Sequence, residues 1–248
     1  MLAGGVGAAR FLSGLVQVIE PSTVTAVVNV GDDTVLHGLH ISPDIDTVTY
    51  TLAGAINPET GWGLRDETWK AMDMVEHYGG PAWFRLGDRD LGTHLYRTGR
   101  LSEGARLSTV TAEIAESWGL AVTLLPATDD PLRTMVTVAS EGEIGFQDYF
   151  VGRQHAVAVT GLRFDGADRA RPAPGVLEAI EDGDLVVIAP SNPLVSIAPV
   201  LAVPGIREAV RGARSRTVAI SPIVAGAALK GPADRMLREL GHEASVVG

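Results

Sequence analysis

The sequence contains no cysteine, which excludes disulfide bonds, thiolate metal sites and a cysteine nucleophile. Lysine is almost absent too, because Lys70 and Lys230 are the only two and every other basic residue is an arginine. Basic residues as a group are outnumbered, with 20 against 30 acidic residues and a net charge of −10. This shortage of positive charge argues against a nucleic-acid backbone or an anionic membrane as the main partner.

The sequence offers no convincing membrane span or signal peptide. The uncharged stretch 185–206 is long enough to cross a bilayer, but Pro190, Pro193, Pro199 and Pro204 interrupt it. We expect it to form a buried strand, a loop and a short helix, and we expect the protein in the cytoplasm. Hydrophobic residues make up 46% of the chain and charged residues 20%, which favours a sizeable core over disorder.

Apolar and β-branched runs alternate with segments of helical spacing, which predicts an α/β fold. We predict a Rossmann-like three-layer sandwich with a mainly parallel sheet, formed by a single domain over residues 1–248. A helical insertion is expected at about 61–119, and a β-hairpin at about 135–150 is expected over the active site. The strands are expected at 1–3, 24–30, 155–159, 185–189 and 217–220.

A glycine-rich turn follows the first expected strand and precedes a helix. Its residues are Gly4, Gly5, Val6 and Gly7, with Arg10 one turn later. Glycines let backbone amides approach a phosphate at a helix N-terminus. Arg10 stands where a dinucleotide fingerprint requires glycine or alanine, so this is not a complete fingerprint. We interpret the turn as a phosphate-binding loop; the alternative is an ordinary tight turn.

Four aspartates follow the second expected strand. Asp32 and Asp33 come directly after it, and Asp44 and Asp46 follow within a short segment after Pro43. We expect that segment to be extended, so that Asp44 and Asp46 share a face. Carboxylates gathered at one sheet edge predict a magnesium site. The alternative is turn chemistry, since aspartate is common in turns.

Two further polar segments are candidates. Arg85 and Asp88 flank a glycine, with His94 further along, although Asp88 also fits a helix cap and His94 a structural histidine. Ser191 and Asn192 lie between two prolines after the expected strand 185–189. A rigid polar loop at the end of a strand could contact a base or a ribose.

Taken in order, these motifs resemble the 2-phospho-L-lactate transferase family (CofD in methanogens, FbiA in actinobacteria), which acts in coenzyme F-420 biosynthesis. The segment 66–69 and the scarcity of lysine are more similar to the actinobacterial FbiA branch. The motifs that carry the resemblance lie at 4–10, 28–33, 43–47, 86–94, 146–148, 189–193 and 221–223.

The resemblance implies a Mg²⁺-dependent transfer. The donor would be lactyl- or enolpyruvoyl-2-diphospho-5'-guanosine, and the acceptor the deazariboflavin Fo. A ribityl hydroxyl of Fo would attack the outer phosphorus, which gives (dehydro) coenzyme F-420-0 and GMP. The resemblance also implies a homodimer. The sequence does not distinguish a lactyl from an enolpyruvoyl donor.

The resemblance assigns roles to the residues described above, and it leaves open which aspartate is the base. The catalytic residues would be Asp46 and Asp88. Fo would contact Asp46, Arg85, Asp88 and His94. Magnesium would be held by Asp32 and Asp44, with Asn29 in support. The donor and its phosphates would contact Gly4, Gly5, Val6, Gly7, Arg10, Ser191 and Asn192.

Two other functions remain as alternatives. A YvcK-like regulator that binds a nucleotide sugar would have the glycine loop and sheet without transferase activity. The motifs at 43–47, 86–90 and 146–148 favour the enzyme over it. A nicotinamide-dependent oxidoreductase would need a full glycine fingerprint and an acid ending the second strand, and Arg10 and Asn29 argue against it. Both termini are expected to be shorter than in family members.

Overall fold

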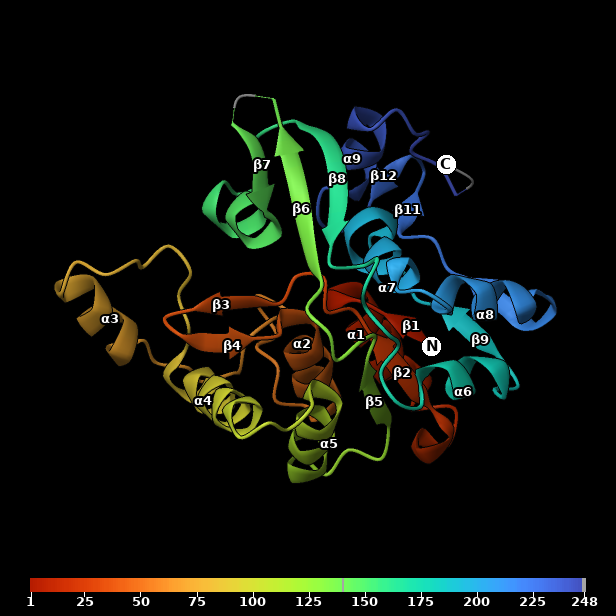
Figure 1. Ribbon diagram of the computed structural model, residues 1–248, viewed down its shortest axis with the longest axis horizontal. Coiled ribbons are helices and arrows are strands. Elements are labelled where there is room, and N and C mark those ends of the chain that lie inside the picture. The colour runs from red at the N-terminus through yellow and green to blue at the C-terminus, as the bar shows by residue number, and fades with distance from the viewer. Residues whose placement is uncertain (140, 247–248) are drawn as a thin grey trace.

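A five-stranded parallel sheet forms the centre of the protein, in the computed structural model that describes residues 1–139 and 141–246 (Figure 1). Its strand order is β10-β9-β1-β2-β5. The predicted α/β fold with a mainly parallel sheet is therefore confirmed. The strands are β1 (Leu2–Ala3), β2 (Thr25–Val28), β5 (Thr123–Pro126), β9 (Val186–Ile188) and β10 (Thr217–Ala219).

The shortest strand lies in the middle of this sheet. In β1, Leu2 pairs with Val27 on one side and Ile188 on the other, and it is fully buried. Parallel strands covered on both faces are nearly continuous apolar runs, which explains why β2 was recognisable in the sequence. The short β1 is held from both sides, and its carboxyl end carries the glycine-rich turn.

Helices flank the sheet and bury its apolar faces. Leu12 of α1 and Ile45 of α2 belong to the main core, together with Val28 of the sheet. The helices outside the insertion are α1 (Gly5–Leu15), α2 (Pro43–Leu52), α6 (Val176–Glu181), α7 (Ala198–Ala202), α8 (Ile206–Gly212) and α9 (Ala233–Glu239). The short helical turns are η1 (Pro21–Thr23), η3 (Pro193–Ile197) and η4 (Arg214–Arg216).

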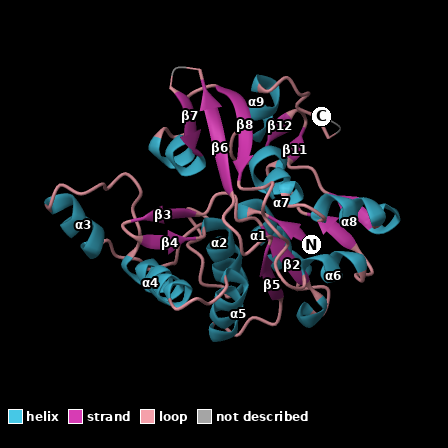
Figure 2. Cartoon of the chain, viewed as in Figure 1, coloured by secondary structure: helices cyan, strands magenta, loops and turns pink. Residues whose placement is uncertain are grey.

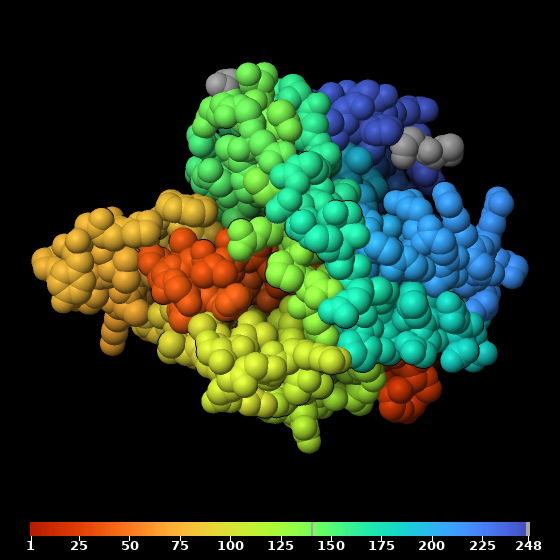
Figure 3. Space-filling view, in the orientation of Figure 1, coloured from red at the N-terminus to blue at the C-terminus, as the bar shows by residue number. Residues whose placement is uncertain are grey.

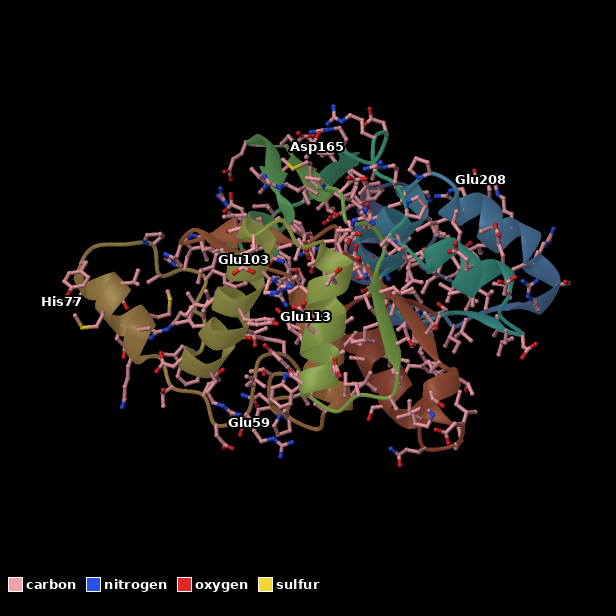
Figure 4. All side chains as sticks on the ribbon, turned by 60° about the horizontal axis from the view of Figure 1, so that its bottom comes forward. Glu59, His77, Glu103, Glu113, Asp165 and Glu208 are labelled. Carbon is pink, nitrogen blue, oxygen red and sulfur yellow. The ribbon has the colours of Figure 1, made fainter. Side chains whose placement is uncertain are left out.

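The segment predicted as a helical insertion contains three helices. They are α3 (Lys70–His77), α4 (Asp88–Ser102) and α5 (Leu107–Ser117). The segment around α3 projects from the body of the molecule in Figure 3. Arg100 joins α4 to α5 because it pairs with Glu113, and it also pairs with Glu103 just after α4; both glutamates are labelled in Figure 4. Two short antiparallel strand pairs lie outside the larger sheets. They are β3 (Thr34–Leu36) with β4 (Leu39–Ile41), and β11 (Ile223–Val224) with β12 (Ala227–Ala228).

A second, antiparallel sheet lies above the first in Figure 2. Its order is β7-β6-β8, from β6 (Arg133–Val138), β7 (Gly142–Gly145) and β8 (Val159–Asp165). The predicted hairpin is therefore confirmed for β6 and β7, while residue 140 of its turn lies outside the described residues. The predicted strand at 155–159 is wrong, because β8 starts at Val159.

The strand expected to continue to residue 150 ends at Gly145. Residues 148–152 instead form the helical turn η2 (Asp148–Gly152). Phe146 stacks on Phe150 at a centroid distance of 5.3 Å, and Tyr149 is fully buried between the turn and the sheet. This aromatic packing requires the four-residue spacing of a helical turn and would be lost in a strand.

The described residues contain no single helix that is long and apolar enough to cross a membrane. The helices spanning Pro193–Ala202 and Ile206–Gly212 meet the length and composition criteria only as a pair, and they are bent by 96° at their junction.

Candidate active site

Asn29, Asp32 and Asp44 meet at the carboxyl end of β2. The Asn29 side-chain amide donates to Asp44 Oδ2 at 2.9 Å and to Asp32 Oδ1 at 3.4 Å. Its carbonyl oxygen accepts from the Gly31 backbone N–H at 2.8 Å, which fixes the amide orientation. The two residues predicted as magnesium ligands are thus brought together by the residue predicted to support them.

The segment that carries Asp44 and Asp46 is helical, and the prediction that it is extended is wrong. Pro43 begins α2 directly after Ser42, and proline is favoured at the first position of a helix. Residues two apart on a helix do not share a face. Asp44 therefore faces Asn29 and the glycine turn, while Asp46 faces α4.

Asp46 is held by a buried arginine of α4. Arg97 donates to both carboxylate oxygens of Asp46, through Nη1 to Oδ2 at 3.1 Å and through Nη2 to Oδ1. Only 1% of Arg97 is exposed, and 5% of Asp46. Burial alone would lower the pKa of Arg97, but the carboxylates of Asp46 and Asp33 outweigh it and raise the pKa. The guanidinium therefore keeps its charge and fixes Asp46 in one orientation.

His94 lies beside this pair. Its Nδ1 is 3.3 Å from Arg97 Nη1, and its Nε2 is 3.4 Å from Asp90 Oδ2. Tyr50 hydroxyl lies 2.6 Å from Asp90 Oδ1. With 1% exposure, His94 contacts these residues in the structure, and its contact with Fo stays a prediction.

Burial shifts the titration of the carboxylates around Asn29. It raises the pKa of Asp32 well above its ordinary range, with help from the neighbouring Asp44 and Asp33 charges. It also raises the pKa of Asp33, against a hydrogen bond from Ser42 and the charge of Arg97. For Asp44 burial raises the pKa to about 6. These carboxylates are costly to ionise side by side unless a cation joins them.

The residues at this position fit a divalent cation. Asp32 and Asp44 offer oxygen ligands of the kind that Mg²⁺ prefers, and the buried Asp33 Oδ1 has no hydrogen-bond partner within the described part of the chain. A second cluster, Asp46, Asp90 and His94, has ligand atoms within 4.8 Å of one another. Arg97 already pairs with Asp46 in that cluster and would repel an added cation. The assignment of magnesium to Asp32 and Asp44 stays a prediction.

We expect Mg²⁺ to stabilise the protein more at neutral pH than in acid. The folded-state pKa of Asp44 lies above its ordinary value, so folding takes up protons between that value and about pH 6 and stability falls as pH rises. At a hundredfold excess over its Kd, a ligand adds about 2.7 kcal/mol. Thermal melts at about pH 5 and 7.5, with and without Mg²⁺, measure this. An Asp44→Asn variant stabilised by Mg²⁺ as much as the parent would contradict the assignment.

The glycines of the first turn allow neighbouring segments to approach closely. A Cβ on Gly7 would lie 2.2 Å from the Pro190 carbonyl oxygen, and one on Gly5 would lie 2.7 Å from Asp44 Oδ1. Ser191 donates to the Gly4 carbonyl at 2.6 Å, so the predicted donor loop packs against the glycine turn. Close packing thus accounts for these glycines, and phosphate binding by their amides stays a prediction.

Two further residues, predicted to contact the donor substrate and the acceptor Fo, lie apart from each other. Asn192 accepts from the Leu194 N–H at 3.0 Å, which caps the turn η3. Arg85 is exposed and forms ion pairs with Asp73 and Glu76. Their contacts with substrates stay predictions.

Asp88 holds the start of a neighbouring helix. Its carboxylate accepts from the Lys70 and Ala71 backbone N–H groups at 3.1 and 3.0 Å and from the Thr68 hydroxyl. These hydrogen bonds lower its pKa. Glu67 in return accepts from the N–H groups of residues 89 and 90, both at 2.8 Å, at the start of α4. The two carboxylates thus cap each other's helices, and no contact joins Asp88 to Asp46 in the described residues.

A family model described as 2-phospho-L-lactate transferase CofD matches residues 1–247. The chain belongs to this family. The resemblance found in the sequence, including its actinobacterial branch, is confirmed. A phosphoenolpyruvate transferase of Kitasatospora aureofaciens is 48% identical over 249 residues, which cover 98% of this chain and 78% of that protein. Phosphoenolpyruvate transferases of Streptomyces coelicolor and Mycolicibacterium smegmatis are 47% and 45% identical and are covered to 78% and 80% of their lengths by 99% of this chain.

Solved structures share the fold of this CofD-family chain. Two structures of a Bacillus halodurans protein, described in one case as a member of the UPF0052 family, superpose with TM-scores of 0.58 and 0.61. Sequence identities are 22% and 20%, and the matches cover 84% and 88% of this chain. The chain spans 63% and 67% of those structures. At this identity the likeness establishes the fold alone.

Three residues that the structure gathers around Asp46 and His94 were not chosen as candidates in the sequence: Tyr50, Asp90 and Arg97. A signal for two of them was present, because Asp90, His94 and Arg97 follow one another at spacings of four and three. On a helix this spacing places them on one face. A charged helix face is usually solvated, and this one is buried by tertiary packing of α4 against β4 and α5 together with the hydrogen bonds to Tyr50 and Asp46 of α2.

We expect Asp88→Ala and Glu67→Ala to lower the Tm by about 2–4 °C each, because each variant loses a helix cap. Glu67→Ala is the matched control, since it removes the reciprocal cap and carries no predicted catalytic role. Differential scanning calorimetry measures the Tm of each variant, and a transfer assay measures its rate. If the two variants have the same transfer rate, Asp88 acts only as a helix cap. A loss of rate confined to Asp88→Ala would support its catalytic role.

Proposed function

We propose that this protein transfers a phospholactyl or phosphoenolpyruvyl group from a guanosine-diphosphate-linked donor to the deazaflavin Fo. Membership in the CofD family over residues 1–247 is the observation that carries this proposal. The phosphoenolpyruvate transferases to which it is similar favour the enolpyruvoyl donor. GMP and a (dehydro) F-420-0 product would result.

Two separate sets of aspartates at the sheet edge have different roles in this proposal. Asp32 and Asp44 would hold Mg²⁺, which supplies charge neutralisation for the diphosphate when bound. Phosphoryl transfer depends mainly on positioning and charge neutralisation. Burial raises the pKa of Asp33, the charge of Arg97 lowers it, and the charges of Asp46 and Asp44 raise it.

We assign Asp46 as the general base. The ribityl hydroxyl oxygen of Fo would bond to the outer phosphorus as its proton passes to an Asp46 carboxylate oxygen. The bond between that phosphorus and the bridging oxygen breaks, and GMP leaves with the electron pair. Burial raises the pKa of Asp46, Arg97 opposes this rise, and the two hydrogen bonds from Arg97 orient the carboxylate for this step. Asp88, by contrast, has its carboxylate committed to the start of α3.

The remaining roles follow the family resemblance. The glycine turn, Arg10, Ser191 and Asn192 would contact the donor. Arg85, Asp88 and His94 would contact Fo, and the protein would form a homodimer, which light scattering tests.

The direct test mixes the purified protein with Fo, Mg²⁺ and each donor separately and follows the products by mass spectrometry. We expect F-420-0 or its dehydro form together with GMP, and faster turnover with one donor. A folded protein that binds GDP yet yields no product from either donor would overturn the proposal in favour of a nucleotide-binding regulator. Undiminished turnover in excess chelator would remove magnesium from it.

A further inference from the structure

Two cationic side chains from opposite ends of the chain converge on one glycine. Gly61 is buried, and a Cβ built on it would lie 3.2 Å from Lys230 Nζ and 3.5 Å from Arg10 Nη2. The same position is 3.3 Å from Val6 Cγ1, within the glycine turn. Gly61 has a φ of 76°, in the left-handed region that favours glycine. The backbone here leaves room for both cations to approach the turn.

Lys230 also fastens this loop. Its Nζ donates to the Thr60 carbonyl at 2.8 Å, which joins residues 170 positions apart. Lys230 precedes α9, and Arg10 belongs to α1, so three separate parts of the fold meet beside the glycine turn. The bond to Thr60 uses one of the three hydrogens of the ammonium group and leaves the others available.

The two cations lack an acidic partner. Other close pairs on the surface combine opposite charges, such as Arg153 with Glu141 and Arg163 with Glu143. Neither Arg10 nor Lys230 forms an ion pair with any carboxylate in residues 1–139 and 141–246. Glu59, two residues before Gly61, lies at the outer edge of the molecule in Figure 4. Other arginines, such as Arg207 and Arg211, also form no ion pair in the described residues, but Arg10 and Lys230 differ from them because both approach Gly61 beside the glycine turn.

The two cations also repel each other. Partial burial and the nearby charge of Arg10 lower the pKa of Lys230. A ligand carrying negative charge would relieve this repulsion and gain two charge-assisted hydrogen bonds. Arginine and lysine together suit a phosphate or carboxylate group.

We propose that Arg10 and Lys230, set by the loop at Gly61, form an anion subsite that binds the terminal charged group of the donor. The group is an oxyanion of the portion to be transferred, either its phosphoryl or its carboxylate. This inference rests on the proposed function for the identity of the donor, while anion binding itself does not depend on it.

Isothermal titration with inorganic pyrophosphate and with GDP, each with Mg²⁺, tests the subsite. We expect Lys230→Met and Arg10→Met each to raise the Kd of pyrophosphate or GDP, or the KM of the donor, by about tenfold or more. Lys70→Met is the matched control, because Lys70 is the only other lysine and its side chain lies on α3; we expect it to bind like the parent. Lys230→Arg should recover most of the affinity, and binding of Fo should be unchanged in all variants.

The outcomes separate the two candidate groups and the two proposals. Weaker pyrophosphate and GDP binding assigns the phosphoryl group, whereas unchanged binding with a raised donor KM assigns the carboxylate. If the parent catalyses no transfer but Lys230→Met still weakens pyrophosphate, the subsite stands and the proposed function fails. If Lys230→Met and Arg10→Met match the parent in pyrophosphate binding, GDP binding and donor KM, the subsite is overturned. Circular dichroism confirms that each variant is folded.

Discussion

Replacing Asp46 with alanine is expected to lower the transfer rate by about 10²–10⁴-fold and the stability by about 3–5 kcal/mol. The rate is expected to fall because the proposed general base is removed. The stability falls because Arg97, with 1% exposure, is left as a buried charge without its bidentate partner. Rate assays and denaturant unfolding measure the two effects.

A second substitution separates these effects. In the double variant Asp46→Ala/Arg97→Met both charges are gone, and we expect most of the lost stability to return. The rate should stay at the level of Asp46→Ala, because methionine restores packing and no base. A single Asp46→Ala variant with parental turnover would contradict the role of Asp46. A double variant no more stable than the single one would contradict the ion pair as the cause.

Replacing Gly7 with alanine is expected to destabilise the protein by about 3 kcal/mol or more, at the upper end of overpacking costs. The added Cβ would lie 2.2 Å from the Pro190 carbonyl oxygen, which is backbone and cannot rotate away. Either α1 or the loop at Ser191 must shift, and the hydrogen bond from Ser191 to the Gly4 carbonyl would be strained. Donor binding should weaken as well.

Gly14 provides the matched control for this substitution, on the same helix. A Cβ there meets nothing within 4 Å, and alanine is favoured over glycine in helices by up to about 1 kcal/mol. Gly14→Ala should therefore be neutral or stabilising in urea unfolding. A Gly7→Ala variant that unfolds at the same urea concentration as Gly14→Ala would show that the contact with Pro190 relaxes without cost.

Strands of the parallel sheet were predictable because they are apolar on both faces, as in β2 and β9. The strand β5 was missed: it ends in Pro126 and reads as part of an apolar run that is compatible with a helix. The start of β8 was misplaced because Gly161, Arg163 and Asp165 interrupt the apolar pattern. These residues are tolerated because β8 belongs to an antiparallel sheet, and such a sheet can expose one face to water.

At the site, residue types were predictable and their directions were not. The four aspartates and Asn29 do gather at one sheet edge. Pro43 after Ser42 is typical of the start of a helix. The segment was nevertheless interpreted as extended, and this interpretation placed Asp44 and Asp46 on one face. Arg97 could not be found as a buried residue, because burial of an arginine depends on a partner far away in sequence.

The first turn of α2 contributes one aspartate to each of two separate clusters. Asp44 faces Asn29 and Asp32, and Asp46, two residues later, faces Arg97 on α4. A helix turn moves as one rigid piece, so a small rotation or tilt of α2 changes both arrangements together. A cation that draws Asp44 toward Asp32 must therefore also strain or relieve the grip of Arg97 on Asp46. The proposed metal site and the proposed base are thus joined through a single turn of helix.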